Sequence, residues 1–224
     1  MSDAAAMKWF KTTFGKDVEA AVAGTPFDLN MLTAIAMQET SYIWGPIYQT
    51  QPVDVVLEVC VGDVIGAPGR KAFPKSREEL LANPKGGAMF DVARGALKRV
   101  AEVTGKLTVS AQKPDKFCHG FGIFQYDIQK FLTDPDYFLQ KKWCSFEECV
   151  RVCVGELKHA LKRTYGADKK ELTHDEKVYV CIAYNRGSAN LKKDFKQGFR
   201  DQSGKYYGEY IDRYLRGAEA ISAV

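Results

Sequence analysis

Residues 25–41 read TPFDLNMLTAIAMQETS, and this stretch decides the fold. Thr25 can cap a helix, Pro26 suits the first helical position, and an acid follows in the first turn. Leu32, Ile35 and Ala36 then recur at the spacing of a helix that buries one face. The pattern predicts an amphipathic helix packed against a larger core.

Glu39 is the next step of that apolar stripe, seven residues after Leu32. It therefore lies on the face expected to be buried, close to the C-terminal end of the helix. Desolvation and the negative end of the helix dipole both raise the pKa of a carboxyl so placed. A carboxyl that is protonated near neutral pH can protonate a glycosidic oxygen. The alternative is a helix that ends near Met37 and leaves Glu39 solvated.

Asn185 repeats this pattern in a second segment. Val178, Cys181 and Ile182 form an apolar stripe, and Asn185 is its next step. A buried amide needs hydrogen-bond partners, so it could hold a sugar acetamido group or a water. The alternative is that Asn-Arg-Gly simply ends the helix.

A third segment, residues 120–125, reads GFGIFQ. Two glycines in an extended apolar segment permit close approach of another backbone or of a ligand. A sugar chain could then bind main-chain groups while Gln125 supplies a side-chain amide. The alternative is a bulge in a strand.

The rest of the chain reads as helices separated by turns, with no internal repeat and no low-complexity linker. Residues 45–69 are expected to form a loop with a short helix or strand, and residues 106–126 to be extended. Capping boxes open two of the helices, at Ser145 and Thr173. The helices are expected at residues 76–81, 87–103, 145–166, 173–185 and 207–215, with a short one after Ser188. The helix over residues 87–103 is expected to end at Gly105 and to bury Met89, Val92, Ala93, Ala96, Val100 and Val103. The fold class is therefore mainly α (α+β) with a small β component.

Composition excludes several classes of protein. The 224 residues can bury a substantial core, and no apolar run approaches the length of about 18 residues that would span a membrane. A net charge of +4, with no Arg/Lys run interleaved with aromatics, argues against nucleic acid. A mildly basic protein is still attracted to an anionic polymer such as cell wall.

The six cysteines show no metal-ligand spacing. No pair forms a CxxC motif and the three histidines are scattered, so no metal site is expected. Cys149 and Cys153 share one face of a predicted helix, and buried free thiols are the favoured interpretation. Disulfides stay open if the protein works outside the cytoplasm.

Taken in order, the three segments resemble the soluble lytic transglycosylase and goose-type lysozyme group. That group shows an AIAxxES helix, a GLMQ segment and an AYNxG helix in this order. Here residues 34–41 read AIAMQETS, residues 122–125 read GIFQ and residues 183–187 read AYNRG. Residues 155–166, GELKHALKRTYG, are similar to the YLxxLxxxYG helix of the group. The resemblance covers residues 25–44 and roughly 118–215.

The resemblance implies a lysozyme-like fold in which Glu39 is the general acid and later the base, without a cofactor. A tyrosine of the last helix, taken as Tyr210, is expected to hydrogen-bond near the carboxylate. The residues expected to contact the glycan are Ser41, Gly122, Ile123, Phe124, Gln125, Tyr184, Asn185 and Tyr210.

Two departures from the group are visible. Thr40 stands where the group usually has serine, which keeps the hydroxyl. More seriously, 82 residues separate Glu39 from Gly122. We therefore expect one catalytic domain over residues 1–224, with residues 45–117 inserted in it as a lid or cleft wall.

The implied activity is cleavage of the MurNAc–GlcNAc bond of peptidoglycan strands by one carboxyl, with help from the N-acetyl group of the substrate. The product is an anhydro sugar or a hydrolysed end, and the sequence does not distinguish a lytic transglycosylase from a hydrolase. A second carboxylate would favour hydrolysis. Its candidates, each expected to be a surface charge, are Asp54, Glu58, Asp63 and Asp127. A chitin- or chitosan-cleaving enzyme and an inactive wall-binding protein are the alternatives.

Residues 1–9 lack the basic start and apolar run of a secretory signal. The protein is therefore expected to be cytoplasmic, to leave by a route that needs no cleaved signal, or to have its signal outside this sequence; it acts on the wall in the periplasm or in a target cell. A cytoplasmic protein would be delivered to the cell wall by phage-type lysis or by injection through a secretion apparatus. In the second case an inhibitor protein in the producing cell is an expected partner.

Overall fold

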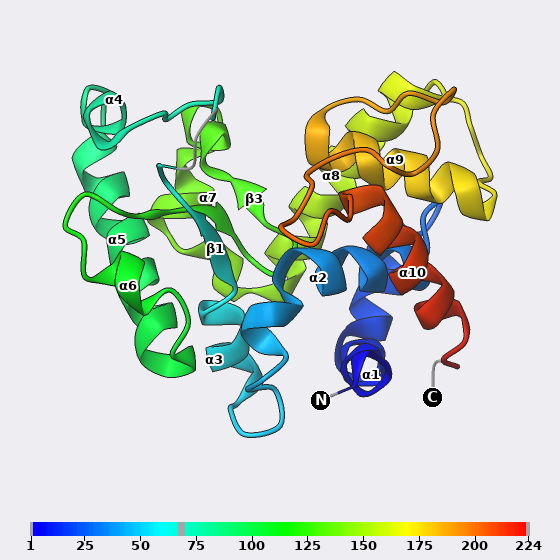
Figure 1. Ribbon diagram of the computed structural model, residues 1–224, viewed down its shortest axis with the longest axis horizontal. Helices are drawn as coiled ribbons and strands as arrows, with labels where there is room; N and C mark the ends of the chain where they lie inside the picture. Colours follow the sequence, from blue (N-terminus) through cyan, green and yellow to red (C-terminus); the bar gives the residue numbers. More distant parts are fainter. Residues whose placement is uncertain (1, 67–69, 223–224) are drawn as a thin grey trace. The chain divides into compact units, whose positions relative to one another are not determined.

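The computed structural model describes residues 2–66 and 70–222. These residues form mainly helices, with one small antiparallel sheet (Figure 1). The chain divides into two compact units, which we describe separately. Unit 1 comprises residues 1–39 and 150–224, and unit 2 comprises residues 40–149. Unit 2 is thus inserted within unit 1, over a wider range than the expected residues 45–117.

Unit 1 is built from helices. They are α1 (Asp3–Val22), the first part of α2 (Leu29–Trp44), most of α8 (Phe146–Thr164), α9 (His174–Arg186) and α10 (Tyr207–Glu219). Sequence reasoning did not predict α1. Its buried face contains Lys11 and Gly15 among the apolar residues, which weakens the periodic signal.

The start of α2 differs from the prediction. Asp28, not Thr25, caps the helix, because the Met31 N–H donates to Asp28 Oδ1 at 2.8 Å. The Thr25 hydroxyl instead donates to the Val22 carbonyl and closes the end of α1. At its other end α2 continues to Trp44, so Glu39 lies inside the helix and the alternative of an end near Met37 is wrong.

The capping box predicted at Thr173 is confirmed, and Gly187 ends α9 in the left-handed conformation. The helices predicted over residues 145–166 and 207–215 are confirmed as α8 and α10. The short helix after Ser188 is wrong, since residues 187–206 form an irregular loop. In that loop the Gln197 side chain bonds main-chain groups of Asn190 and Asp194, in place of helical hydrogen bonds.

Unit 2 combines short helices with the sheet. Its elements are α3 (Val53–Glu58), β1 (Val61–Val64), α4 (Arg77–Leu81), α5 (Gly86–Thr104), α6 (Thr108–Ala111), β2 (Cys118–Phe121), β3 (Tyr126–Asp127), η1 (Ile128–Leu132), α7 (Pro135–Leu139) and η2 (Lys142–Cys144). The strands lie in the order β1-β2-β3 and pair antiparallel. Phe121 pairs with Tyr126, so residues 122–125 form the hairpin turn.

Most predictions for unit 2 are confirmed. A short helix follows the Ser76 cap, and Gly105 ends α5 in the left-handed conformation. Residues 106–126 are extended only in part, because residues 108–111 form α6. Within α5, Val92, Ala96 and Val103 are only half-buried, since Leu97 takes the inward position with Met89, Ala93 and Val100.

Aromatic rings form the core beneath the sheet. The Phe121 ring lies 4.9 Å from Trp143 and 5.3 Å from Phe138, measured between ring centroids. The six cysteines are free thiols, five of them buried and Cys144 partly exposed. Among the described residues, none of the helices has both the length and the apolar character needed to cross a membrane.

Candidate active site

Glu39 meets a tyrosine from the other end of the sequence. Tyr207, the first residue of α10, is 2% exposed, and its hydroxyl donates to Glu39 Oε1 at 2.8 Å. Burial and the charge of Glu39 raise the pKa of Tyr207 well above its usual value. The phenol therefore stays protonated and remains a hydrogen-bond donor to the carboxyl.

Two side chains of α9 are also influenced electrostatically by Glu39. Burial, the Cys153 thiol and Glu39 raise the pKa of the Tyr184 phenol. Burial and Glu39 likewise raise the pKa of the Cys181 thiol. Glu39 thus accepts a hydrogen bond from one neutral phenol of α10 and raises the pKa of a phenol and a thiol of α9.

The tyrosine expected near the carboxylate was Tyr210, and the structure gives that contact to Tyr207. The Tyr210 hydroxyl instead donates to Asp201 Oδ2 at 2.6 Å. The reason is the position of each residue on α10, which buries Tyr207, Ile211 and Tyr214. Tyr210 lies beside this stripe and is only half-buried.

Asn185 is exposed, so the expectation of a buried amide is wrong. The alternative holds, because Asn185 lies in the last turn of α9 and Gly187 ends the helix. Asn185 still lies close to Tyr207. A Cβ added at Gly198 would be 3.2 Å from Asn185 Oδ1 and 2.7 Å from Tyr207 Cβ. Only a glycine lets the loop pass these two residues, and its positive φ of 89° imposes the same choice.

The remaining predicted residues belong to unit 2. Ser41 is half-buried in α2, and the preceding Thr40 hydroxyl donates to the Ile123 carbonyl at 2.7 Å. The side chains of Ile123 and Phe124 are buried, with the Phe124 ring 5.9 Å from Phe146. They anchor the hairpin turn in the core, so a ligand here would meet main-chain groups and Gln125.

The glycines of this region make room for Gln125. Its Nε2 donates to the carbonyls of Gly122 at 2.9 Å and Cys60 at 3.3 Å. A Cβ at Gly120 would be 2.2 Å from Gln125 Oε1, and one at Gly62 would be 2.9 Å from it. The glycines therefore permit close approach, but the group that approaches is the Gln125 side chain and not the backbone or ligand that was expected.

Gly122 is constrained from another side. A Cβ there would be 2.7 Å from Cys149 Sγ and 3.0 Å from Tyr137 Oη, and its φ is 79°. The turn thus rests on a buried thiol and phenol, and its shape depends on this packing.

The four candidate second carboxylates all belong to unit 2. Asp54 and Asp63 are exposed, as expected of surface charges. Glu58 pairs with Arg99 at 3.0 Å. Asp127 forms a two-pronged pair with Arg70 at 2.8 and 2.9 Å. Burial alone would raise the pKa of Asp127, but hydrogen bonds from His119 and Arg70 outweigh it and lower this pKa to about 2.

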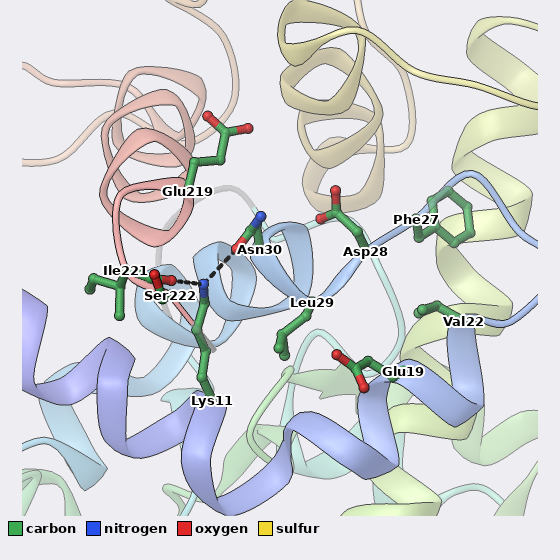
Figure 2. A pocket seen from close by; sticks show the side chains of 10 residues that line it. All are labelled: Lys11, Glu19, Val22, Phe27, Asp28, Leu29, Asn30, Glu219, Ile221 and Ser222. Carbon is green, nitrogen blue, oxygen red and sulfur yellow. Dashed lines mark hydrogen bonds between the residues drawn. The ribbon is translucent and has the colours of Figure 1, made fainter. Parts of the chain in front are cut away.

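A second polar feature of unit 1 is a cavity of about 440 Å³ near Lys11 (Figure 2). The Lys11 ammonium donates to Asn30 Oδ1 and to the carbonyls of Ala218 and Ile221, each at 2.6 Å. All three donors of the ammonium are therefore used within the chain. Burial lowers the pKa of Lys11. This lysine ties α1 to α2 and to the end of α10, which is a structural role.

No known family model, curated protein or solved structure matches this chain. Over residues 2–66 and 70–222, no group of three or more His, Cys, Asp and Glu side chains is placed to hold a metal ion. The feature of unit 1 best suited to chemistry is the Glu39 carboxyl with its phenol donor. Such a pair can deliver a proton and then stabilise the resulting carboxylate.

Proposed function

We propose that this protein cleaves the MurNAc–GlcNAc bond of peptidoglycan, with Glu39 as the general acid. The observation that carries the proposal is the 2.8 Å hydrogen bond from Tyr207 to Glu39 Oε1. It gives a carboxyl on a largely apolar helix face a neutral donor, close to Asn185 at the end of α9. The three ordered segments that resemble lytic transglycosylases support the choice of substrate.

In the proposed reaction Glu39 protonates the oxygen that leaves the muramyl residue. The acetamido oxygen of the substrate attacks the anomeric carbon as the glycosidic bond breaks. Glu39, now a carboxylate, then removes a proton from the muramyl C6 hydroxyl, which closes an anhydro ring, or from a water, which gives hydrolysis. Tyr207 holds Oε1 throughout and stabilises the negative charge that appears after proton transfer.

A mechanism with one carboxyl agrees with the state of the other candidates. Glu58 and Asp127 are each paired with an arginine, and the low pKa of Asp127 makes it a weak base. Asp54 and Asp63 are exposed surface charges. Glu39, by contrast, accepts a hydrogen bond from a phenol that stays neutral.

The test compares release of muropeptides from purified sacculi by the wild type, Glu39→Gln and Glu19→Gln. Glu19 is an exposed glutamate of unit 1 and serves as the matched control. We expect release by the wild type and by the control, and none by Glu39→Gln. The masses of the fragments separate anhydro ends from reducing ends.

Equal release by Glu39→Gln, or no release by the wild type, would contradict the proposal. Chitin and chitosan oligomers are tested in parallel, and cleavage of these alone would assign the protein to that class. Binding to sacculi without any cleavage would identify an inactive wall-binding protein.

A further inference from the structure

The loop between α9 and α10 carries an excess of positive charge. Over residues 186–205, which we name the basic loop, there are six cationic and two anionic side chains. The net charge of +4 equals that of all 224 residues. Every one of the six cationic side chains is exposed: Arg186, Lys192, Lys193, Lys196, Arg200 and Lys205.

The two acids of the basic loop serve its own structure. Asp201 accepts hydrogen bonds from the hydroxyls of Tyr210 at 2.6 Å and Ser203 at 2.7 Å. These bonds lower the pKa of Asp201 to about 2, so it stays ionised. Asp194 accepts from the Lys196 N–H at 3.0 Å. The acids therefore shape the backbone of the loop. Asp194 also lies 4.0 Å from the Lys196 ammonium, and the heads of Arg200 and Lys205 lie over the rings of Tyr206 and Tyr210.

Hydrogen bonds within unit 1 fix the path of the basic loop. Gln197 is 3% exposed, and its amide bonds Asn190 N, Asn190 O and Asp194 O at 2.8 to 3.0 Å. The N–H groups of Tyr207 and Gly208 donate to the carbonyls of Phe199 and Gln197. A surface fixed in this way loses little conformational entropy when it binds.

The same hydrogen bonds join the basic loop to the candidate active site. Phe199 is 69% exposed, and its carbonyl accepts from Tyr207, whose hydroxyl contacts Glu39. Gly198 lies against Asn185 and Tyr207. Tyr207 thus links the loop that carries Phe199 and the cations to Glu39, the proposed acid.

We propose that the basic loop binds the carboxylates of the peptides attached to muramyl residues, with Phe199 as an apolar contact beside them. The inference rests on the proposed function and names a preference within it, for strands that carry peptides over bare glycan. Exposed lysines attract such carboxylates over a distance that depends on salt. Phe199 buries apolar surface when the strand lies on it.

The test measures binding, so it does not depend on cleavage. Glu39→Gln protein is mixed with intact sacculi and with sacculi whose peptides an amidase has removed. In that background, Lys192→Gln/Lys193→Gln/Lys196→Gln is compared with Lys158→Gln/Lys162→Gln/Lys170→Gln. The control removes the same charge from exposed positions of unit 1 outside the basic loop.

We expect affinity for intact sacculi to fall about ten-fold in the basic-loop variant and to change less than about two-fold in the control. Removal of the peptides should weaken binding by the Glu39→Gln protein and narrow the difference between the variants, because the amidase leaves one lactyl carboxylate on each muramyl residue. Raising NaCl from about 50 mM to about 500 mM should have the same effect.

Equal affinity for intact and stripped sacculi, or equal loss in both variants, would overturn the inference. The inference would also be overturned if the protein bound a single-stranded oligonucleotide more tightly than sacculi and the basic-loop variant no longer bound it. A third contradicting result is loss of binding to sacculi when phosphate-bearing wall polymers are removed. Failure of the proposed function is distinct, because it appears as equal muropeptide release by wild type and Glu39→Gln.

Discussion

Helices α2 and α10 are joined by polar contacts at both ends, and the two contacts differ in kind. At one end Lys11 links Asn30 of α2 to the carbonyl of Ala218, in the last turn of α10, and to that of Ile221, which follows the helix. At the other end Tyr207, which opens α10, donates to Glu39 of α2. The same two helices thus hold a buried cation at one end and a carboxyl at the other.

The Lys11 ammonium and the Glu39 carboxyl differ in the partners that their contacts give them. The three donors of Lys11 match three acceptors of the chain at 2.6 Å, so a ligand could bind the ammonium only by breaking these bonds. The phenol of Tyr207, which donates to Glu39, is neutral, because its pKa is raised well above its usual value. One contact holds the fold, and the other suits proton transfer.

The sharpest test of this comparison replaces Glu39 with glutamine. We expect muropeptide release to fall by about three orders of magnitude, because the amide cannot donate the proton. The free energy of unfolding should change by less than about 1 kcal/mol, since the amide oxygen can still accept from Tyr207. Enzyme assays and urea unfolding measure the two quantities. A large loss of stability would make Glu39 a structural residue like Lys11.

Lys11→Ala should show the opposite profile. We expect a loss of about 3 kcal/mol in the free energy of unfolding, because two carbonyls and an amide oxygen lose their donor. Activity per folded molecule should be unchanged at a temperature where the variant is folded. Lys11→Met keeps the volume of the side chain and separates lost packing from lost hydrogen bonds. Reduced activity in folded Lys11→Met would place this lysine in the site.

The ends of helices could be predicted where capping residues adjacent in sequence mark them. The capping box at Thr173 and the left-handed Gly105 and Gly187 depend on neighbouring residues alone. Helix α1 was missed because its buried face includes Lys11, whose acceptors lie in distant parts of the chain. Local pattern does not report a partner that only folding brings near.

The candidate site was predictable in part for the same reason. Periodicity and motif order selected Glu39, but the choice between Tyr207 and Tyr210 depends on which face of α10 is buried. The basic loop was missed because its six cations are scattered over 20 residues and form no run. The path of the loop involves hydrogen bonds from the Gln197 side chain to main-chain groups of Asn190 and Asp194, which no sequence pattern predicts.

Asp127 of unit 2 resembles Lys11 in that its charge is paired within the chain, here with Arg70 and His119. Its pKa of about 2 lies below the usual 3.8, so its stabilisation is present above about pH 4 and is lost as pH falls toward 2. That difference corresponds to about 2 kcal/mol. Asp127→Asn should lose this amount near pH 7, and its stability should vary less between pH 4 and 2. Asp54→Asn is the control, and equal effects in both variants would contradict the assignment.

The smallest expected effect belongs to Tyr207→Phe, which removes one hydroxyl from the contact with Glu39. We expect muropeptide release to fall about ten-fold, the value of one hydrogen bond to a charged group. The pH–activity profile should move toward higher pH, because the phenol favours the charged form of the carboxyl. Tyr210→Phe, whose hydroxyl contacts Asp201, should leave the pH–activity profile unchanged. If the two variants behave alike, the hydroxyl of Tyr207 has no part in the chemistry, and its contact with Glu39 is a tie of the same kind as Lys11.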